Sequence, residues 1–302
     1  MDPLQIIFVF GFFAVSPGKT VVTTAICRGL LNKGFKLAPF KPRSGHNLWY
    51  QHNAFLKCRK EARLYCEDII KLKKASRCSL QYEILNPIDA LLAPLNARTF
   101  LEKENLREMY IIETSTFYHL LVERYTLWKD GMLRTTLCVN EKNLLDHPLI
   151  DRDYIRGLKS GSDEVLSILD VNGWNSIFKG MGPDCTSTCS WKIAEEHELM
   201  VVEGYNDAVC PAPRLRYDVV VGVAPGVAAL YNPSDFHRVI DVKSKTGDDP
   251  MGMIAEEIVD YIKPEIIFSI PALHTHDINN FDLLSQRLDD MIDALVEKLS
   301  DA

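Results

Sequence analysis

Residues 5–20 read QIIFVFGFFAVSPGKT, and this stretch decides the fold. Gln5–Phe10 is a continuous apolar run, which is typical of a central parallel strand covered on both faces. A loop follows, and Thr20–Asn32 then has the apolar spacing of a helix that Gly34 can end. Lys36–Phe40 predicts a second, short strand. Strand, loop, helix and strand in this order open a doubly wound, mostly parallel α/β sheet.

The turn that ends in Gly18-Lys19-Thr20 fits the second half of the phosphate-loop pattern G-x-x-x-x-G-K-[ST]. Phe13 stands where the pattern has its first glycine, and the nearest glycine is Gly11. The start of a helix can still face an anion there, with Lys19 supplying charge and Thr20 a Mg²⁺ ligand. The alternative is that Pro-Gly-Lys-Thr merely starts a helix. We expect nucleotide binding by the residues of this turn, namely Ser16, Gly18, Lys19, Thr20 and Val21.

Strand patterns return near the end of the chain. Leu199–Val202 is followed at once by Glu203-Gly204, and Val219–Val223 by a Pro-Gly turn. The carboxyl end of a parallel strand is the edge where open α/β sheets bind ligands. A carboxylate there can hold Mg²⁺, so Glu203 is a candidate metal ligand and Asp207 a second one. The alternative for Glu203 is an acidic residue of a surface loop.

The middle of the chain predicts mostly helices. Residues 53–76 have the pattern of one charged amphipathic helix, whereas residues 83–96 are broken by two prolines and predict a loop. Residues 97–196 are mostly helical in pattern. We therefore expect one P-loop NTPase-like domain over residues 1–302, with a helical insertion over about residues 97–196.

The bulk composition excludes several classes of protein. The chain has 302 residues, of which 47% are hydrophobic and 25% charged, so neither disorder nor a coiled coil is expected. The formal net charge of −7 gives no global attraction to nucleic acid or to an anionic membrane. Leu4–Val15 is too short to span a bilayer, and no basic residue precedes it. The eight cysteines include no CxxC pair, only Cys185 and Cys189 as a lone CxxxC. We expect a soluble, cytoplasmic protein with free thiols.

The segment GFFAVSPGKTVVTTAICRGLLNKGFKLAPFKPRSG, residues 11–45, resembles the start of dethiobiotin synthetase. Phe40–Gly45 is similar to that family's aromatic-Lys-Pro-x-x-Ser-Gly stretch. MVVEGYND at 200–207 is similar to its strand ending in Val-Glu-Gly, and VVVGVAPG at 219–226 to its next strand. The chain also resembles uncharacterised archaeal proteins described as P-loop ATPases or GTPases, which have a similar KPxSGHN stretch.

The synthetase resemblance implies ATP and Mg²⁺ as cofactors and a role for each matching residue. Lys19 would contact the β- and γ-phosphates, and Thr20 the Mg²⁺. Glu203 would be a further Mg²⁺ ligand at the end of its strand. Lys41 and Ser44 would contact the carboxylate or carbamate that is phosphorylated.

The chain departs from that family at several positions. Ser16 replaces an acidic residue three positions before the loop lysine, and Tyr205-Asn206-Asp207 replaces a glycine-rich pair. The family also has an Asp soon after its Ser-Gly. Here the nearest candidates are Glu61 and Asp68, and we choose Asp68 as the metal ligand.

We expect a ligase-like enzyme that uses ATP and Mg²⁺ to phosphorylate a small carboxylate or carbamate, with Lys19, Lys41 and Ser44 in catalysis. The second strand is expected beside the first, so that Lys41 opens next to the phosphate loop. His46 could read a substrate oxygen or cap a turn. The alternatives are an NTPase switch and a non-hydrolysing nucleotide-binding protein that acts through partners. The expected partner is a small-molecule substrate, with a homodimer as one option and neither a membrane nor nucleic acid.

Overall fold

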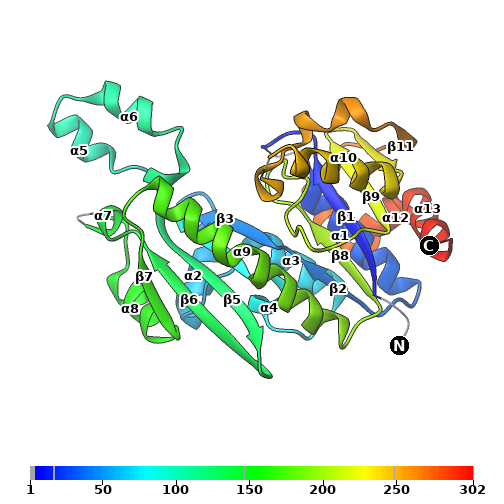
Figure 1. The fold of residues 1–302 in the computed structure, drawn as a ribbon, viewed down its shortest axis with the longest axis horizontal. Helices are drawn as coiled ribbons and strands as arrows, with labels where there is room; N and C mark the ends of the chain where they lie inside the picture. Colours follow the sequence, from blue (N-terminus) through cyan, green and yellow to red (C-terminus); the bar gives the residue numbers. More distant parts are fainter. Residues whose placement is uncertain (1–3, 16–17, 146, 248, 302) are drawn as a thin grey trace. The chain divides into compact units, whose positions relative to one another are not determined.

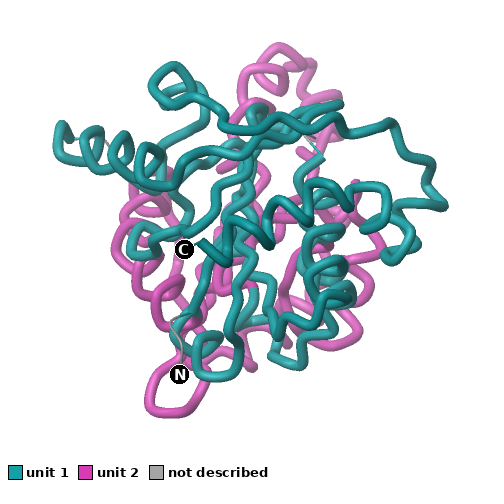
Figure 2. The backbone as a smooth tube through the Cα atoms, turned by 90° about the vertical axis from the view of Figure 1, so that its right-hand side faces the viewer, with its two compact units in different colours: residues 1–43, 68–85, 190–302 teal, residues 44–67, 86–189 magenta. Residues whose placement is uncertain are grey.

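The computed structural model describes residues 4–15, 18–145, 147–247 and 249–301 (Figure 1). The chain divides into two compact units, each built from segments that are distant in the sequence (Figure 2). Unit 1 comprises residues 1–43, 68–85 and 190–302, and unit 2 comprises residues 44–67 and 86–189. Each unit contains one β-sheet and several helices. The prediction of an α/β protein is therefore confirmed.

Unit 1 contains a six-stranded sheet in the order β11-β10-β9-β1-β8-β2. Its strands are β1 (Gln5–Gly11), β2 (Leu37–Phe40), β8 (Leu199–Glu203), β9 (Val219–Ala224), β10 (Val227–Tyr231) and β11 (Pro264–Ser269). Strands β9, β1, β8 and β2 are parallel, and β10 is antiparallel to both of its neighbours. The carboxyl ends of the four parallel strands therefore meet at one edge of the sheet.

Helices cover both faces of this sheet. On one face, α1 packs with α12 and α13, where Ile26 and Leu30 of α1 share a core with Ile7 and Val9 of β1. On the other face, Phe8 and Phe10 of β1 contact the ring of Phe236 in α10. The helices in or bordering unit 1 are α1 (Lys19–Asn32), α3 (Glu67–Ser76), α4 (Tyr82–Leu85), α10 (Pro233–Lys245), α11 (Thr275–Asn279), α12 (Phe281–Arg287) and α13 (Asp289–Ser300), with short 3₁₀ turns at Pro250–Gly252, Ala255–Glu257 and Val259–Tyr261.

Strand β2 does not lie beside β1, contrary to the expectation from the sequence, because β8 lies between them. Every residue of β8 is buried, as a central strand requires. Strand β2 contains Pro39, which has no N–H to donate, and this suits the edge position that β2 takes. The order β1-β8-β2 places the end of β8, with Glu203, between the end of β1 and Lys41, which directly follows β2.

Unit 2 contains a five-stranded sheet in the order β3-β4-β5-β6-β7. Pairs β4–β5 and β5–β6 are antiparallel, and β6–β7 is parallel. Its strands are β3 (Arg43–Asn47), β4 (Ile88–Leu92), β5 (Leu120–Lys129), β6 (Met132–Val139) and β7 (Glu164–Ser167). Its helices are α2 (His52–Glu61), α5 (Ala97–Glu102), α6 (Leu106–Ile112), α7 (Glu141–Leu144), α8 (Arg152–Ser160) and most of α9 (Val171–Ala194), with a 3₁₀ turn at Thr116–Tyr118.

Residues 97–196 contain helices α5 to α9, but they also include strands β5, β6 and β7, which the sequence pattern did not indicate. Asp130 and Gly131 join β5 to β6, and both have positive φ angles, 53° and 75°. An Asp-Gly pair in this conformation is a favoured two-residue hairpin turn. The prediction of a helical stretch missed this turn. The turn permits β5 to pair with β6, and this pairing is a tertiary contact that the local pattern does not contain.

Two further stretches differ from the expectation. Residues 53–76 form two helices, α2 and α3, because Ala62 takes a left-handed conformation with a φ of 50° and ends α2. Residues 83–96 contain β4, which begins directly after Pro87, a position where a proline costs no strand hydrogen bond. None of the helices in the described part of the chain is long and apolar enough to cross a membrane.

Candidate functional site

Side chains from three elements meet at the carboxyl edge of the unit 1 sheet. Lys41 directly follows β2, Glu203 ends β8, and Thr20 lies in the first turn of α1. Nζ of Lys41 lies 2.5 Å from Oε1 of Glu203, and Oγ1 of Thr20 lies 3.1 Å from the same oxygen. Lys41 also donates to the carbonyl oxygen of Gly204 at 3.2 Å. The three side chains that the sequence suggested separately therefore form one hydrogen-bonded cluster.

Asp68, near the start of α3, joins the same cluster. Its Oδ2 lies 3.1 Å from Nζ of Lys41, and the hydroxyl of Thr20 also hydrogen bonds to it. Burial raises the pKa of Asp68, but the charge and hydrogen bond of Lys41, together with Thr20, more than offset this and hold the pKa below its usual value. Asp68 is therefore a carboxylate at neutral pH.

Lys19 lies beside the cluster at the start of α1, with 7% of its surface exposed. Its ammonium donates a hydrogen bond to the carbonyl oxygen of Asn206 in the loop after β8. Burial, and then repulsion from Lys41, lower the pKa of Lys19 to about 8. An anion bound here would offset both effects.

Glu203 is fully buried, and its second carboxylate oxygen, Oε2, has no hydrogen-bond partner within the described residues. A buried oxygen of this kind is costly unless a donor or a cation satisfies it. No group of three or more Asp, Glu, His or Cys side chains that could hold a metal occurs in the described ranges. Mg²⁺ in nucleotide sites takes one or two carboxylates plus phosphates and water. Thr20, Asp68 and Glu203 fit that requirement.

Gly204 is needed for packing next to Glu203. A Cβ atom on Gly204 would lie 2.8 Å from the carbonyl oxygen of Ala208 and 3.5 Å from the ring of Phe8. The glycine that follows Glu203 therefore has a steric cause that does not depend on a ligand.

The loop that the sequence predicts to bind phosphate is described only in part, because Ser16 and Pro17 lie outside the described residues. The role of Ser16 stays a prediction. Gly18 has a φ of 92°, a left-handed conformation that glycine adopts without strain, and its carbonyl oxygen accepts from the N–H of Val21. Phe13 and Val15 are exposed on the loop.

Val21 borders two cavities of unit 1. One, of about 160 Å³, is lined by Gly18, Val21 and the turn Ala224-Pro225-Gly226, and is largely apolar. The other, of about 350 Å³, adds Thr20 together with Lys71 and Lys74 of α3. The first turn of α1 is therefore flanked by two cavities.

Ser44 belongs to unit 2, where its hydroxyl lies 2.6 Å from Oδ1 of Asp89 and 3.1 Å from Oδ1 of Asn86. Nδ1 of His46 lies 3.0 Å from Oδ2 of the same Asp89, and both side chains are fully buried. His46 neither faces solvent nor caps a turn. The substrate contact expected of Ser44 stays a prediction, and its described contacts stabilise the interior of unit 2.

The sequence did not predict a role for Asp89 or for the carbonyl oxygen of Asn206. Asp89 lies in the stretch that was interpreted as a loop, so the short, mostly apolar run after Pro87 could have drawn attention to it. Asn206 has a φ of 44°, and Asn after a strand and a glycine is a common choice for such a left-handed turn.

The free energy of unfolding is expected to fall as the pH rises between about 6.5 and about 10, because of His46. Burial lowers the pKa of His46, but the Asp89 carboxylate, with a smaller contribution from Cys58, outweighs this and raises the pKa from 6.5 to about 10. The stabilisation is therefore complete below the unfolded value and is lost as the pH passes the folded one. Urea unfolding of wild type and His46→Gln across this range checks it. The variant should lose less stability with pH, and equal slopes would contradict the assignment.

Comparison of the sequence with models of protein families gives no match, and comparison with curated proteins gives none either. The fold and the site by themselves define an α/β protein with a Lys-Thr-Asp-Glu cluster at the carboxyl edge of a largely parallel sheet.

Proposed function

We propose that the protein binds ATP and Mg²⁺ at this edge and transfers the γ-phosphoryl group to a small carboxylate or carbamate, in the manner of dethiobiotin synthetase-like enzymes. The observation that carries the proposal is the buried carboxylate of Glu203, which shares one oxygen with Lys41 and Thr20 and leaves the other without a partner among the described residues. A nucleotide-bound Mg²⁺ would complete its coordination.

Each side chain of the cluster then has a defined task. Lys19, which starts α1, would exchange its carbonyl partner Asn206 for the β- and γ-phosphates. Thr20, Asp68 and Glu203 would hold the metal. Bound Mg²⁺ would neutralise charge on the phosphoryl oxygens. The apolar cavity beside Gly18 and Val21 offers a wall for the base.

The transfer step follows from this placement. An oxygen of the acceptor carboxylate would bond to the γ-phosphorus while the bond from that phosphorus to the β-γ bridging oxygen breaks, giving an acyl phosphate and ADP. Lys41 is buried beside Glu203 and Asp68, so it is held in one position. Catalysis would then come from positioning and from charge neutralisation, as is general for phosphoryl transfer.

Lys19→Ala is expected to weaken ATP binding by at least about tenfold, because one charge-assisted contact contributes about 1.5–3 kcal/mol. Isothermal titration calorimetry of wild type and variant with ATP and Mg²⁺ measures this. Lys36→Ala, an exposed lysine before β2, is the matched control and should bind as wild type does. Unchanged affinity in a folded Lys19→Ala protein, or no ATP binding by wild type, would overturn the proposal.

A further inference from the structure

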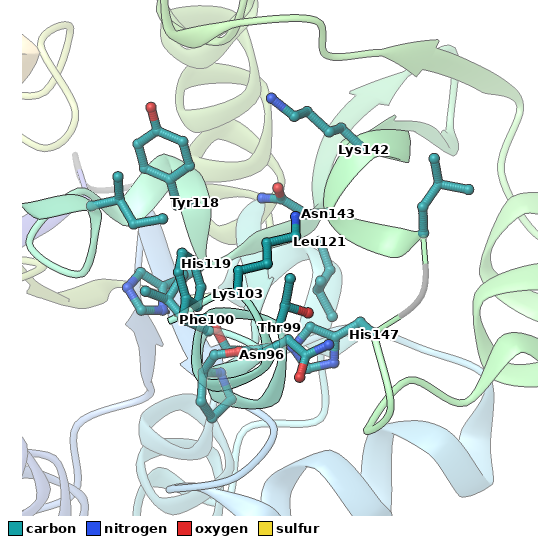
Figure 3. A pocket seen from close by; sticks show the side chains of 15 residues that line it. Asn96, Thr99, Phe100, Lys103, Tyr118, His119, Leu121, Lys142, Asn143 and His147 are labelled. Carbon is teal, nitrogen blue, oxygen red and sulfur yellow. Dashed lines mark hydrogen bonds between the residues drawn. The ribbon is translucent and has the colours of Figure 1, made fainter. Parts of the chain in front are cut away.

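Unit 2 contains a cavity of about 430 Å³ whose wall includes the short helices α5 and α6 (Figure 3). The loop after β4, the start of β5 and the region around α7 complete the wall. Ligand cavities in proteins commonly have volumes of about 300–1,000 Å³. The whole lining belongs to one unit, so the cavity is a property of that unit alone.

The charged side chains of the described lining have one sign. Lys103, at the end of α5, and Lys142, in α7, both line the cavity, and the described lining residues include no Asp or Glu. Neither ammonium has an ion-pair or hydrogen-bond partner in the ranges that the structure describes. Two lysines at one cavity that have no partner among the described residues, in a chain of net charge −7, favour an anionic ligand.

The polar side chains between the lysines are already held in place. Nε2 of His147 lies 2.8 Å from the carbonyl oxygen of Pro94, and Nδ2 of Asn143 donates to the carbonyl oxygen of Leu120 at 2.9 Å. Each ring nitrogen of His119 lies 2.9 Å from a backbone carbonyl oxygen. These contacts fix this part of the wall without using the lysines, so this part is formed before any ligand arrives.

The remaining wall is apolar, and little burial stabilises the two helices that form part of it. Phe100, Ile112 and Leu121 line it. Helices α5 and α6 have six and seven residues, and neither has a buried side chain. Helices this short are not stable alone in water. A ligand with an apolar body would give the α5–α6 hairpin the burial that it lacks.

We propose that this cavity binds a small organic anion with a compact apolar body, with Lys103 and Lys142 neutralising its charge and the apolar wall covering its body. The inference is independent of nucleotide binding in unit 1, because the two sets of residues do not overlap. A charged group alone would leave Phe100 and Ile112 unused, and an apolar molecule alone would leave both lysines unused.

Two fluorescent probes separate charge from apolar contact. 1-Anilinonaphthalene-8-sulfonate carries a sulfonate, and N-phenyl-1-naphthylamine has the same rings without it. The full-length protein should bind the sulfonate more tightly, with an affinity that falls as salt is added. Lys103→Gln/Lys142→Gln should weaken sulfonate binding about five- to tenfold, as two exposed charge contacts allow, and leave the neutral probe unchanged. Lys129→Gln, exposed and outside the cavity, is the control.

Hydrogen exchange locates the bound probe. The sulfonate should protect amides of residues 97–112 in wild type and protect them less in the double variant at the same probe concentration. Equal sulfonate affinity in wild type and double variant would overturn the proposal, as would protection confined to unit 1. Equal affinity of both probes for wild type would also overturn it, because charge would then have no part in binding.

Discussion

Lys41→Met is expected to lower the free energy of unfolding by about 3–5 kcal/mol, the usual cost of removing one partner of a buried ion pair. Glu203 is completely buried, and Lys41 is its only cationic partner among the described contacts. Without Lys41 the carboxylate keeps only the Thr20 hydroxyl at 3.1 Å. Urea unfolding monitored by circular dichroism measures the loss.

A double-mutant cycle isolates the pair. Glu203→Gln should cost less than Lys41→Met, because Lys41 keeps Asp68 and the carbonyl oxygen of Gly204 as partners. Lys41→Met/Glu203→Gln should be more stable than the sum of the single losses predicts, by up to about 3 kcal/mol. Lys36→Met is the exposed control and should change little. Strict additivity would show that the two side chains do not interact in solution.

Asp68→Asn is expected to lower Mg²⁺-dependent ATP turnover by about a hundredfold, the scale on which single electrostatic groups at a transition state contribute. The change keeps the shape of the side chain but removes the charge that faces Lys41 and that would face the proposed Mg²⁺. ATP affinity measured in the presence of a chelator should stay close to that of wild type, because no phosphate contact is lost. Equal turnover by wild type and variant would show that Asp68 is not part of the proposed metal site.

The same assay separates an enzyme from a switch. Wild-type turnover should rise when a suitable small carboxylate is added, or an amine together with bicarbonate to form its carbamate, because an oxygen of the carboxylate or carbamate takes the γ-phosphoryl group. Asp68→Asn should lose most of this stimulation. A turnover rate that is the same across a panel of such compounds would count against the synthetase-like proposal and favour the NTPase switch.

The sequence alone determined the local parts of unit 1. The apolar run at Gln5–Phe10, the helix after Gly18 and the strand before Glu203 are all where the pattern predicts, because each follows from contacts within a few residues and from burial of an apolar segment. Thr20 and Glu203 were singled out for the same reason, since both lie at the ends of predictable elements.

The sequence did not determine which strands are neighbours. It predicted β1 beside β2. Strand β8 lies between them, but in the sequence it comes only after the long segment that ends at residue 196. The sequence pattern also predicted one continuous helix over residues 53–76, whereas Ala62 ends α2 there. It predicted a helical insertion over residues 97–196, whereas the Asp130-Gly131 turn joins two strands of a hairpin within that stretch. In each case one backbone conformation or one long-range pairing outweighs the local pattern.

Only the tertiary structure decided how the polar residues are shared between the two units. Lys41 and Ser44 are three positions apart, yet Lys41 pairs with Glu203 and Asp68 in unit 1 and Ser44 bonds to Asp89 in unit 2. The reason is physical. A buried charge or hydroxyl must find its partner wherever the fold supplies one, and the partners here come from strands and helices 27 to 162 positions away, beyond the reach of any local pattern.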